Sequence, residues 1–472
     1  MRLFDSIVNI GKVADLRKRV LFTFFIMFVY RLGGHIPTPG INTDALAQFF
    51  QQNAGTLLGY LNMFSGGNFS RLTIFALGIM PYITAAIILE LMTVVWPYLE
   101  KLQKEGDLGR RKITQYTRYL TIILSIFQSL GIAYTLERNT SSGGAAFVLN
   151  PGLAFTLMTV LTLTTGSAFV MWLGEQITDR GVGNGMSLII FAGIVVGLPS
   201  AVSNLWTLVQ TSSWGALTVP GMLLLLIFML AVVAFIVYVE RSERRIPVQY
   251  AKRVVGRKLM GGQSTHLPIR VNSGGVMPVI FAASILTFPQ TLSMLPAIKN
   301  STVFGPMFDA MGYGRPLYSL IYCVSIIFFA YFYVSIIFNP VEVADNMRKY
   351  GGFIPGIRPG KYTSEYINTI LTRVTLVGAI YLVIVSLVPQ FMLSGTQFNH
   401  LPGFLGDWFA NWPTWFLNGL GVTFYFGGTS LLIVVGVAMD TVQQVEAQLI
   451  MRHYEGFTAR SARIRGRRSY WA

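Results

Sequence analysis

Long apolar segments separated by short polar ones dominate the pattern of this chain. A helix that spans a membrane needs roughly 20 mostly apolar residues, and ten segments approach that length. We therefore predict an all-α integral membrane protein. Its ten spanning helices are expected at residues 20–37, 76–96, 115–136, 153–173, 185–203, 217–239, 272–292, 316–338, 370–392 and 424–446.

The two ends of the chain follow other patterns. In residues 1–19, apolar side chains recur at helical spacing and three basic residues follow, which predicts an amphipathic helix on the membrane surface. This start lacks the continuous apolar core of a cleavable signal peptide. Residues 447–472 are expected to form a basic tail. The apolar positions of the first segment are Leu3, Phe4, Ile7, Ile10, Val13 and Leu16.

The basic residues indicate the orientation of the spans. If the N-terminus is cytoplasmic and the ten spans alternate, 31 of the 36 Lys and Arg lie on the cytoplasmic side and five lie outside. Cytoplasmic loops of membrane proteins carry such an excess. We therefore expect both termini in the cytoplasm. The net charge of +16 then mostly reflects topology and requires no nucleic-acid partner.

Composition narrows the chemistry. Charged residues make up 12% of the chain, against about 25% in soluble proteins. The single Cys323 excludes a disulfide framework, and the four His have no companions at metal-ligand spacing. No phosphate-binding Gly-x-x-x-x-Gly-Lys-Ser/Thr loop occurs. We expect no cofactor, no metal and no enzymatic activity.

Two short motifs each occur twice in the sequence. "GIMPYITAAIIL" (Gly78–Leu89) matches "GVMPVIFAASIL" (Gly275–Leu286) at eight of twelve positions, and "GMSLII" at 185–190 resembles "GTSLLI" at 428–433. Each pair lies five crossings apart, so its members run in opposite directions. The chain is thus expected to form two inverted five-helix halves, 20–205 and 206–446, and the functional site of such repeats lies near the midplane.

The repeat also pairs particular residues. It aligns Ile83 with Ile280 and Ile190 with Ile433. A single Ile in a membrane helix usually packs or contacts lipid, but four related in pairs favour a shared place on the central axis. Pro81 and Pro278 are also equivalent, and we expect both helices to bend there because proline removes a backbone hydrogen bond.

Several longer and more polar stretches resemble the SecY family, whose members are the main subunit of the bacterial protein-conducting channel. The resemblance spans nearly the whole chain in order. It rests on "FSGGNFSRLTIFALGIMPYITAAIILELMT" (64–93), "GRRKITQYTRYLT" (109–121), "WLGEQITDRGVGNGMSLIIFAGIVVGLP" (172–199), "YAKRVVGRKLMGGQSTHLPIRVNSGGVMPVIFA" (250–282), "FNPVEVADNMRKYGGFIPGIRPG" (338–360) and "FYFGGTSLLIVVGVAMD" (424–440).

The resemblance implies an hourglass pore with an apolar ring and a plug outside it. The ring maps onto Ile79, Ile83, Met186, Ile190, Ile280 and Ile433. Relatives often have Ile where Met186 stands. The plug is expected as a short helix at about 63–73, with Gly66 and Gly67 as its hinge. Its residues are Met63, Phe64, Ser65, Gly66, Gly67, Asn68, Phe69, Ser70, Arg71, Leu72 and Thr73.

The resemblance also implies a lateral gate between helices two and three on one side and seven and eight on the other. The residues expected to line this gate are Thr84, Ile87, Glu90, Ser284 and Phe288. Glu90 stands where an amide is expected in this family. Because a carboxylate in lipid costs on the order of 2.5–3.5 kcal/mol, we expect Glu90 to face the wet cytoplasmic funnel or the gate.

Two basic loops are implied to dock the SecA motor ATPase or the ribosome. The residues expected there are Arg244, Arg245, Lys252, Arg253, Arg257, Lys258 and Arg358. Small single-span subunits like SecE and SecG, unfolded precursors and the lipid bilayer are the other implied partners. Residues 394–423 form an external aromatic segment without a predicted role. The implied location is the cytoplasmic membrane of a bacterium.

Two other functions are compatible with part of this pattern. A secondary transporter for a small solute also explains ten helices and inverted repeats, but it predicts buried charges or an ion site in broken helices. The centres of these segments hold almost none. A membrane-embedded enzyme requires a convergent set of His, Asp or Glu, and none is visible in the sequence.

Overall fold

The computed structural model describes most of the chain. It leaves out residues 1–12, 53–61, 63, 64, 139–145, 211–217, 251, 252, 256, 257, 261–263, 293–304, 306, 308, 309, 313, 314, 396–427 and 466–472. The described parts belong to two compact units. Unit 1 lies within Met1–Asn53, Leu58–Gly197 and Val437–Ala472, and unit 2 within Leu198–Gly436.

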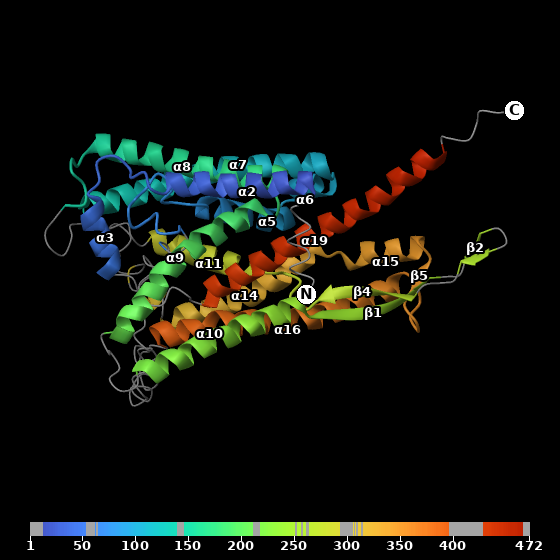
Figure 1. Cartoon of the computed structure of the whole chain (residues 1–472). Coiled ribbons are helices and arrows are strands. Elements are labelled where there is room, and N and C mark those ends of the chain that lie inside the picture. Colours follow the sequence, from blue (N-terminus) through green and yellow to red (C-terminus); the bar gives the residue numbers. More distant parts are fainter. Residues whose placement is uncertain are drawn as a thin grey trace. The chain divides into compact units, whose positions relative to one another are not determined.

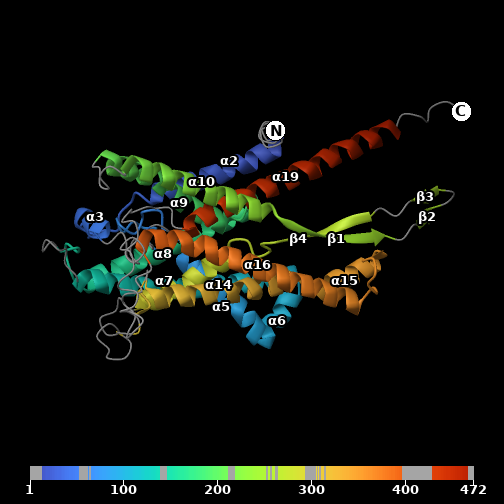
Figure 2. The ribbon, with the colours of Figure 1, turned by 90° about the horizontal axis from the view of Figure 1, so that it is seen from below.

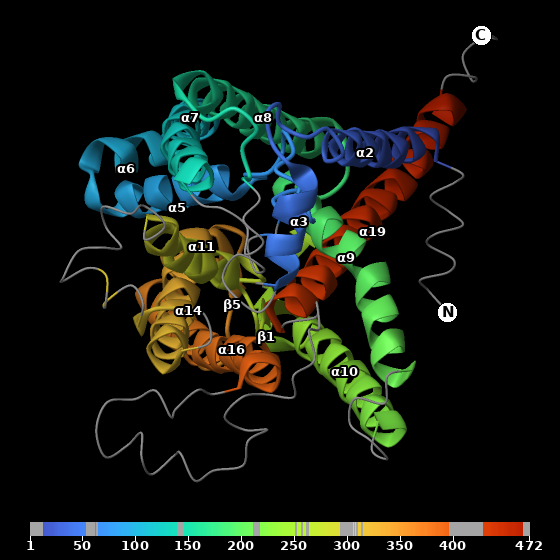
Figure 3. The same ribbon diagram turned by 90° about the vertical axis from the view of Figure 1, so that its left-hand side faces the viewer.

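Unit 1 contains long and short helices. They are α2 (Ala14–Gly33), α3 (Thr43–Gln52), α5 (Met80–Val95), α6 (Pro97–Lys104), α7 (Asp107–Arg138), α8 (Leu153–Arg180), the first part of α9 (Gly185–Gln210) and the part of α19 (Gly428–Arg465) from Val437 onward. Figure 3 shows α5, α7, α8 and α2 following one another, and each neighbouring pair is in contact. The residues from Ala14 onward continue directly into the first predicted span, rather than forming a separate surface helix.

Unit 2 repeats this order with other helices. It contains α10 (Thr218–Arg241), α11 (Met277–Leu292), α14 (Pro316–Ile337), α15 (Pro340–Lys349), α16 (Lys361–Ser394) and the start of α19 (Gly428–Arg465). α11 packs on α14 and α14 on α16. α10 meets α16 through the rings of Phe235 and Tyr381, with centroids 5.7 Å apart. The order α11–α14–α16–α10 therefore matches α5–α7–α8–α2. Figure 1 shows α14 and α16 lying along one another.

The described helices are consistent with the ten predicted spans, since one helix lies in each. By length and composition, six of the described helices can cross a membrane, or seven if α5 and α6 form one broken span. α9 and α11 are shorter apolar helices within the described residues. α5 and α6 are bent by 100° at Trp96, whose extended backbone is typical of a residue before proline.

The repeated Gly-x-Met-Pro motif builds a helix start. Gly78 and Gly275 have φ of +56° and +57°, in the left-handed region, and α5 and α11 begin two residues later. Pro81 and Pro278 thus lie in the first turn, where a backbone N–H has no intrahelical acceptor. The expectation that these prolines bend the two helices is wrong, because neither interrupts a helical hydrogen bond.

The loop at 240–271, for which no strands were predicted, contains a hairpin. β1 (Glu243–Tyr250) pairs antiparallel with β4 (Ser264–Arg270) in a register that runs from Glu243↔Arg270 to Gln249↔Ser264. β5 (Gly352–Phe353) adds to β1, and β2 (Arg253–Val255) pairs with β3 (Lys258–Met260) near the tip (Figure 2). The spans are helical as predicted, and the described strands are confined to these connecting segments.

The hairpin is anchored to unit 2 by its apolar face. Ile246 and Val248 alternate with exposed residues along β1, as expected for a strand with one buried face. They pack with Ile269 of β4 and with apolar residues of α14, α15 and α16. Two alternating apolar positions around Pro247 give too weak a pattern to predict a strand from sequence, which explains why the hairpin was missed.

Candidate functional site

The segment expected to be the plug forms a compact set of turns in unit 1. Its described part, Ser65–Thr73, contains no helix, which differs from the short helix expected. Asn62 organises the turns, since its carbonyl accepts from Gly67 N (2.8 Å) and Ser65 Oγ (3.0 Å), and its Oδ1 accepts from Ser70 N (2.8 Å). Met63 and Phe64 lie outside the described residues.

Positive φ angles explain why this segment turns so tightly. Gly66 and Gly67 have φ of +71° and +82°, and Leu72, at +39°, is the one described residue other than glycine with a positive φ. A side chain in this region strains the backbone. Gly66 and Gly67, which were expected as a hinge, have no side chain to strain, whereas Leu72 keeps its conformation because its side chain is buried in an apolar cluster.

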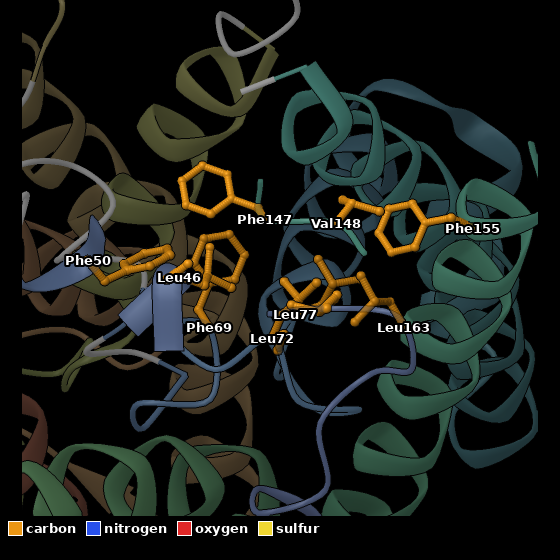
Figure 4. Packing of buried hydrophobic residues seen from close by; sticks show 12 residues of the cluster. Leu46, Phe50, Phe69, Leu72, Leu77, Phe147, Val148, Phe155 and Leu163 are labelled. Carbon is orange, nitrogen blue, oxygen red and sulfur yellow. The ribbon is translucent and has the colours of Figure 1, made fainter. Parts of the chain in front are cut away.

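That cluster holds the C-terminal end of the plug segment. Figure 4 shows Phe69 and Leu72 among Phe50, Phe147 and Leu163, which come from α3, the chain before α8, and α8 itself. The backbone is fixed as well. Pro37 and Thr73 form an antiparallel bridge, and Thr38 N donates to Leu72 O at 2.9 Å.

Four of the six residues expected to form the ring are related by the repeat, Ile83 to Ile280 and Ile190 to Ile433. Ile79 directly precedes α5 and Ile83 lies in its first turn, Met186 and Ile190 lie in the first turns of α9, Ile280 in that of α11 and Ile433 in that of α19. The five Ile side chains are buried. Met186 is half-buried, and its sulfur packs closely against Gly174 of α8.

The structure adds Val276 to this set. Ile83 N donates to Ile79 O at 3.1 Å, and Ile280 N donates to Val276 O at 3.2 Å, so Val276 holds the place in unit 2 that Ile79 holds in unit 1. The repeat signals this equivalence, but Val and Ile differ and the sequence analysis did not select it. Val276 is buried and contacts Gly436, one turn beyond Ile433 in α19.

The residues expected at the lateral gate lie on α5 and α11. Thr84 and Ile87 are buried on α5, and Ser284, the repeat equivalent of Ile87, is buried on α11. The side chain of Phe288 lies outside the described residues. The hydroxyl of Thr84 donates to the carbonyl of Met80 at 3.0 Å, whereas Ser284 Oγ has no hydrogen-bond partner within the described residues.

Glu90 is half-buried near the C-terminal end of α5. Its Oε2 is buried and has no hydrogen-bond partner in the described part of the chain. Arg118 of α7 does not supply one, because its Nε is bonded to Glu175 of α8 at 2.8 Å. Glu90 therefore retains an unmatched carboxylate oxygen, a feature that an apolar helix surface disfavours.

The expected docking residues that the structure describes are exposed. Arg244 and Arg245 lie on β1, and Arg245 pairs with Glu243 at 2.7 Å. Arg358 lies in a turn that is fixed by two contacts. Thr363 Oγ1 donates to the carbonyl of Arg358 at 2.9 Å, and Ile354 is buried in the unit 2 core. The side chains of Lys252, Arg253, Arg257 and Lys258 are outside the described set.

Unit 2 also contains a polar contact that the sequence analysis missed. Asn272 Nδ2 donates to Glu240 Oε1 at 2.7 Å and to Gly275 O at 3.0 Å, so it ties the end of α10 to the start of α11. In unit 1 the equivalent carbonyl, that of Gly78, accepts from Ser167 Oγ of α8 at 3.4 Å. Within the described residues, no group of His, Cys, Asp and Glu could hold a metal ion.

Known proteins resemble this chain over nearly its full length. It is 46% identical over 459 residues to the protein translocase subunit SecY of Escherichia coli strain K12, which covers 97% of this chain and 96% of that protein. The SecY of Aquifex aeolicus is 44% identical over 450 residues, covering 95% and 98%. These relatives give no support to the secondary transporter that was weighed as an alternative.

Solved structures show the same fold. One described as a protein-conducting channel aligns with a TM-score of 0.59 at 18% identity, covering 91% of this chain and 92% of its own. Sec61 from a canine ribosome–channel complex of the endoplasmic reticulum aligns with a TM-score of 0.57, also at 18% identity and with 91% and 92% coverage. The SecY family model matches residues 73–442. The chain therefore belongs to the SecY family.

Proposed function

We infer that this chain is the channel-forming subunit of a protein translocase in the cytoplasmic membrane of a bacterium. The observation that carries this inference is the 46% identity to a protein translocase subunit across 97% of the chain. The fold of protein-conducting channels supports it. The polypeptides that it conducts are unfolded, and it needs no catalytic residues of its own because a partner supplies the ATP hydrolysis.

The chemistry of the proposed ring suits this cargo. A threading polypeptide presents every kind of side chain in turn, and a charged lining would bind and stall those of opposite charge. The residues proposed for the ring are aliphatic apart from one Met, whose unbranched side chain is adaptable. A narrow apolar constriction also dewets and so opposes ion flow. Val276 joins the ring in this proposal, because it is the repeat equivalent of Ile79.

Hydrophobic signal sequences require a second, sideways exit. Leaving about 20 apolar residues in a wet pore forgoes their transfer free energy. We place this exit between helices two and three (α5 and α7) and helices seven and eight (α11 and α14). The proposed gate residues are those on α5 and α11, and Glu90 faces the gate or the cytoplasmic funnel, where water solvates its carboxylate.

The partners follow from the exposed basic residues and from the relatives. We propose that the hairpin and the Arg358 turn dock a SecA-like motor or the ribosome, since a Sec61 relative was solved in a ribosome–channel complex. Ribosomal RNA offers phosphates to such arginines. Small single-span subunits like SecE and SecG complete the complex, and both termini of the chain are cytoplasmic.

A reconstituted transport assay tests this function. The chain, with its co-purifying small subunits, is placed in vesicles with a motor ATPase, ATP and an unfolded precursor. Protection of the precursor from added protease is expected, and a precursor without its signal sequence is the control. A secondary transporter would instead move a small solute down an ion gradient and leave the precursor unprotected.

Cysteine pairs test the gate in the same vesicles. In a Cys323→Ala background, Thr84→Cys is combined with Ser284→Cys. Oxidation is expected to block both translocation and membrane insertion, and reduction should restore them. Each single-cysteine variant is the control. If the oxidised pair still inserts signal sequences, the gate does not lie between these helices.

A further inference from the structure

Two residues at the end of α2 bind the tip of the plug segment. Arg31 Nη1 donates to Gly66 O at 3.1 Å, and the hydroxyl of Tyr30 donates to Ser65 O at 3.4 Å. Asn68 Nδ2 in turn donates to the Tyr30 hydroxyl oxygen at 3.4 Å. Tyr30 thus accepts from one plug residue and donates to another.

The Tyr30 side chain is held in place independently of the plug tip. It is 3% exposed, and its ring stacks on Phe75 with centroids 5.8 Å apart. Phe75 also packs directly on Gly33 in the last turn of α2. The hydroxyl is therefore presented from a fixed position, which is what a positioning residue requires.

The two hydrogen bonds donated by α2 end on backbone carbonyls of the tip, and Gly66 also approaches α9 closely. A Cβ atom on Gly66 would lie 2.8 Å from the Cα of Gly193, so only glycine lets the tip come this close to α9. Gly193 lies one helical turn beyond the proposed ring residue Ile190. The tip thus rests beside the place where we propose the constriction.

The base of the plug, Phe69–Thr73, is attached by different and stronger means. Phe69 and Leu72 are buried in the apolar cluster of Figure 4, and Thr73 is paired with Pro37. Separating the base requires exposing two large apolar side chains as well as breaking backbone hydrogen bonds. Separating the tip from α2 requires the loss of three hydrogen bonds, two donated by Tyr30 and Arg31 and one that Asn68 donates to Tyr30.

We propose that Tyr30 and Arg31 are positioning residues that latch the tip of the plug in the closed channel, and that the base stays attached when the channel opens. This inference rests on the proposed role of residues 63–73 as the plug. Because the latch binds the carbonyl oxygens of Ser65 and Gly66, it depends on the two donors from α2.

The latch is tested by the resting ion conductance of the complex in planar bilayers without precursor. Arg31→Gln removes a charged donor and Tyr30→Phe removes only a hydroxyl. Losing a hydrogen bond from a charged group shifts an equilibrium by roughly tenfold or more, and a neutral one by roughly threefold. We expect conductance to rise by about these factors.

Arg138→Gln is the matched control, since Arg138 stacks on the ring of Tyr134 at the end of α7 and forms no hydrogen bond with the plug within the described residues. It removes an equal charge and is expected to leave the conductance unchanged. Tyr30→Phe keeps the buried ring and decides the question if Arg31→Gln fails to assemble. Unchanged conductance in Tyr30→Phe, or an equal rise in Arg138→Gln, would overturn the latch.

A crosslink tests the fixed base. Bridge partners in an antiparallel pair have Cα atoms about 4.5–5.5 Å apart, which a disulfide can span. Pro37→Cys with Thr73→Cys, in a Cys323→Ala background, should oxidise and still translocate precursor at the unmodified rate. Blocked translocation that reduction restores would show that the base must move. If the unmodified channel moves no precursor at all, the proposed function fails instead.

Discussion

The two units use one scaffold to hold two unlike insertions. In unit 1, Ile74 N donates to Ile36 O at 3.0 Å, and in unit 2, Val271 N donates to Ser242 O at the same distance. Each donor lies four residues before the glycine that starts α5 or α11. The neighbouring bridge Pro37↔Thr73 in unit 1 has its counterpart in Glu243↔Arg270, the first pair of the hairpin.

From this shared pair the two units diverge. In unit 2 the two strands pair over seven residue pairs, and β1 of this hairpin contains Arg244 and Arg245. In unit 1 the pairing ends at once, and the chain makes α3 and the turns of the plug. The comparison teaches that the helix start is the repeated structural element. The segments inserted between the flanking strands differ, and they hold the residues proposed for closure in unit 1 and for docking in unit 2.

The largest expected effect is a loss of stability when Gly166 of unit 1 or Gly378 of unit 2 is replaced by alanine. A Cβ on Gly166 of α8 would overlap the carbonyl of Ile74, whereas one on Gly378 of α16 would lie 2.5 Å from the carbonyl of Val271. Backbone has little room to move, so overpacking should cost about 3 kcal/mol or more at Gly166→Ala and about 1–2 kcal/mol at Gly378→Ala. Thermal unfolding in detergent measures both.

The control for these variants is Ala234→Val, which adds bulk on an exposed position of α10. It should leave the unfolding temperature unchanged. An equal loss at both glycines would show that the two scaffolds are packed alike. No loss at either would break the structural equivalence.

The second largest effect is expected on partner binding, when the hairpin of unit 2 is shortened and the helices that hold it are left unchanged. Replacing residues 251–262 by Asn-Gly joins the strands after Tyr250 with a two-residue turn that suits an antiparallel hairpin. The buried Ile246 and Val248 remain, so folding should be preserved. Four basic residues are lost, and motor or ribosome affinity should fall roughly tenfold or more, since electrostatic contacts to phosphates and acidic surfaces dominate such binding.

Affinity is measured by co-sedimentation at fixed salt. The control exchanges the same four residues, Lys252, Arg253, Arg257 and Lys258, for Gln within the full hairpin. If the shortened hairpin binds normally, docking lies elsewhere, and Arg358→Glu then tests the neighbouring turn.

The smallest effect concerns the two helix starts. Gly78→Ala and Gly275→Ala place a Cβ on left-handed residues and should each cost about 1–2 kcal/mol. Asn tolerates this conformation, so Gly78→Asn and Gly275→Asn should recover part of the loss. Chemical unfolding of the purified protein measures both pairs. A cost at one glycine only would show that the repeated motif is retained for different reasons in the two units.

The apolar pattern predicted most of the fold, because spanning helices are fixed by length and hydropathy alone. The apolar pattern failed where the local backbone conformation determines how a helix begins. The prolines of the repeat look like kinks in sequence, and only the left-handed glycines before them show that they begin helices. The hairpin was missed since its buried face packs on α14, α15 and α16, which are distant in sequence.

The candidate site was predictable to different degrees. Internal repetition alone pointed to Ile83, Ile190, Ile280 and Ile433, because equivalent residues recur at fixed offsets. The plug came only from the family resemblance, since turns without periodicity carry no pattern of their own. Nothing in the sequence marks Tyr30 and Arg31 as partners of Ser65 and Gly66, because they bind carbonyl oxygens, which every residue has.

The turns at 65–79 also set an order for biosynthesis. A helix can enter a bilayer as soon as it is made, because its backbone groups are satisfied within the segment, but turns must find partners elsewhere in the protein. Here some of these contacts come late, because the carbonyl of Gly78 accepts from Ser167, 89 residues onward, and Gly66 packs against Gly193 of α9. The contacts of these turns are therefore complete only after α8 and α9 have been synthesised.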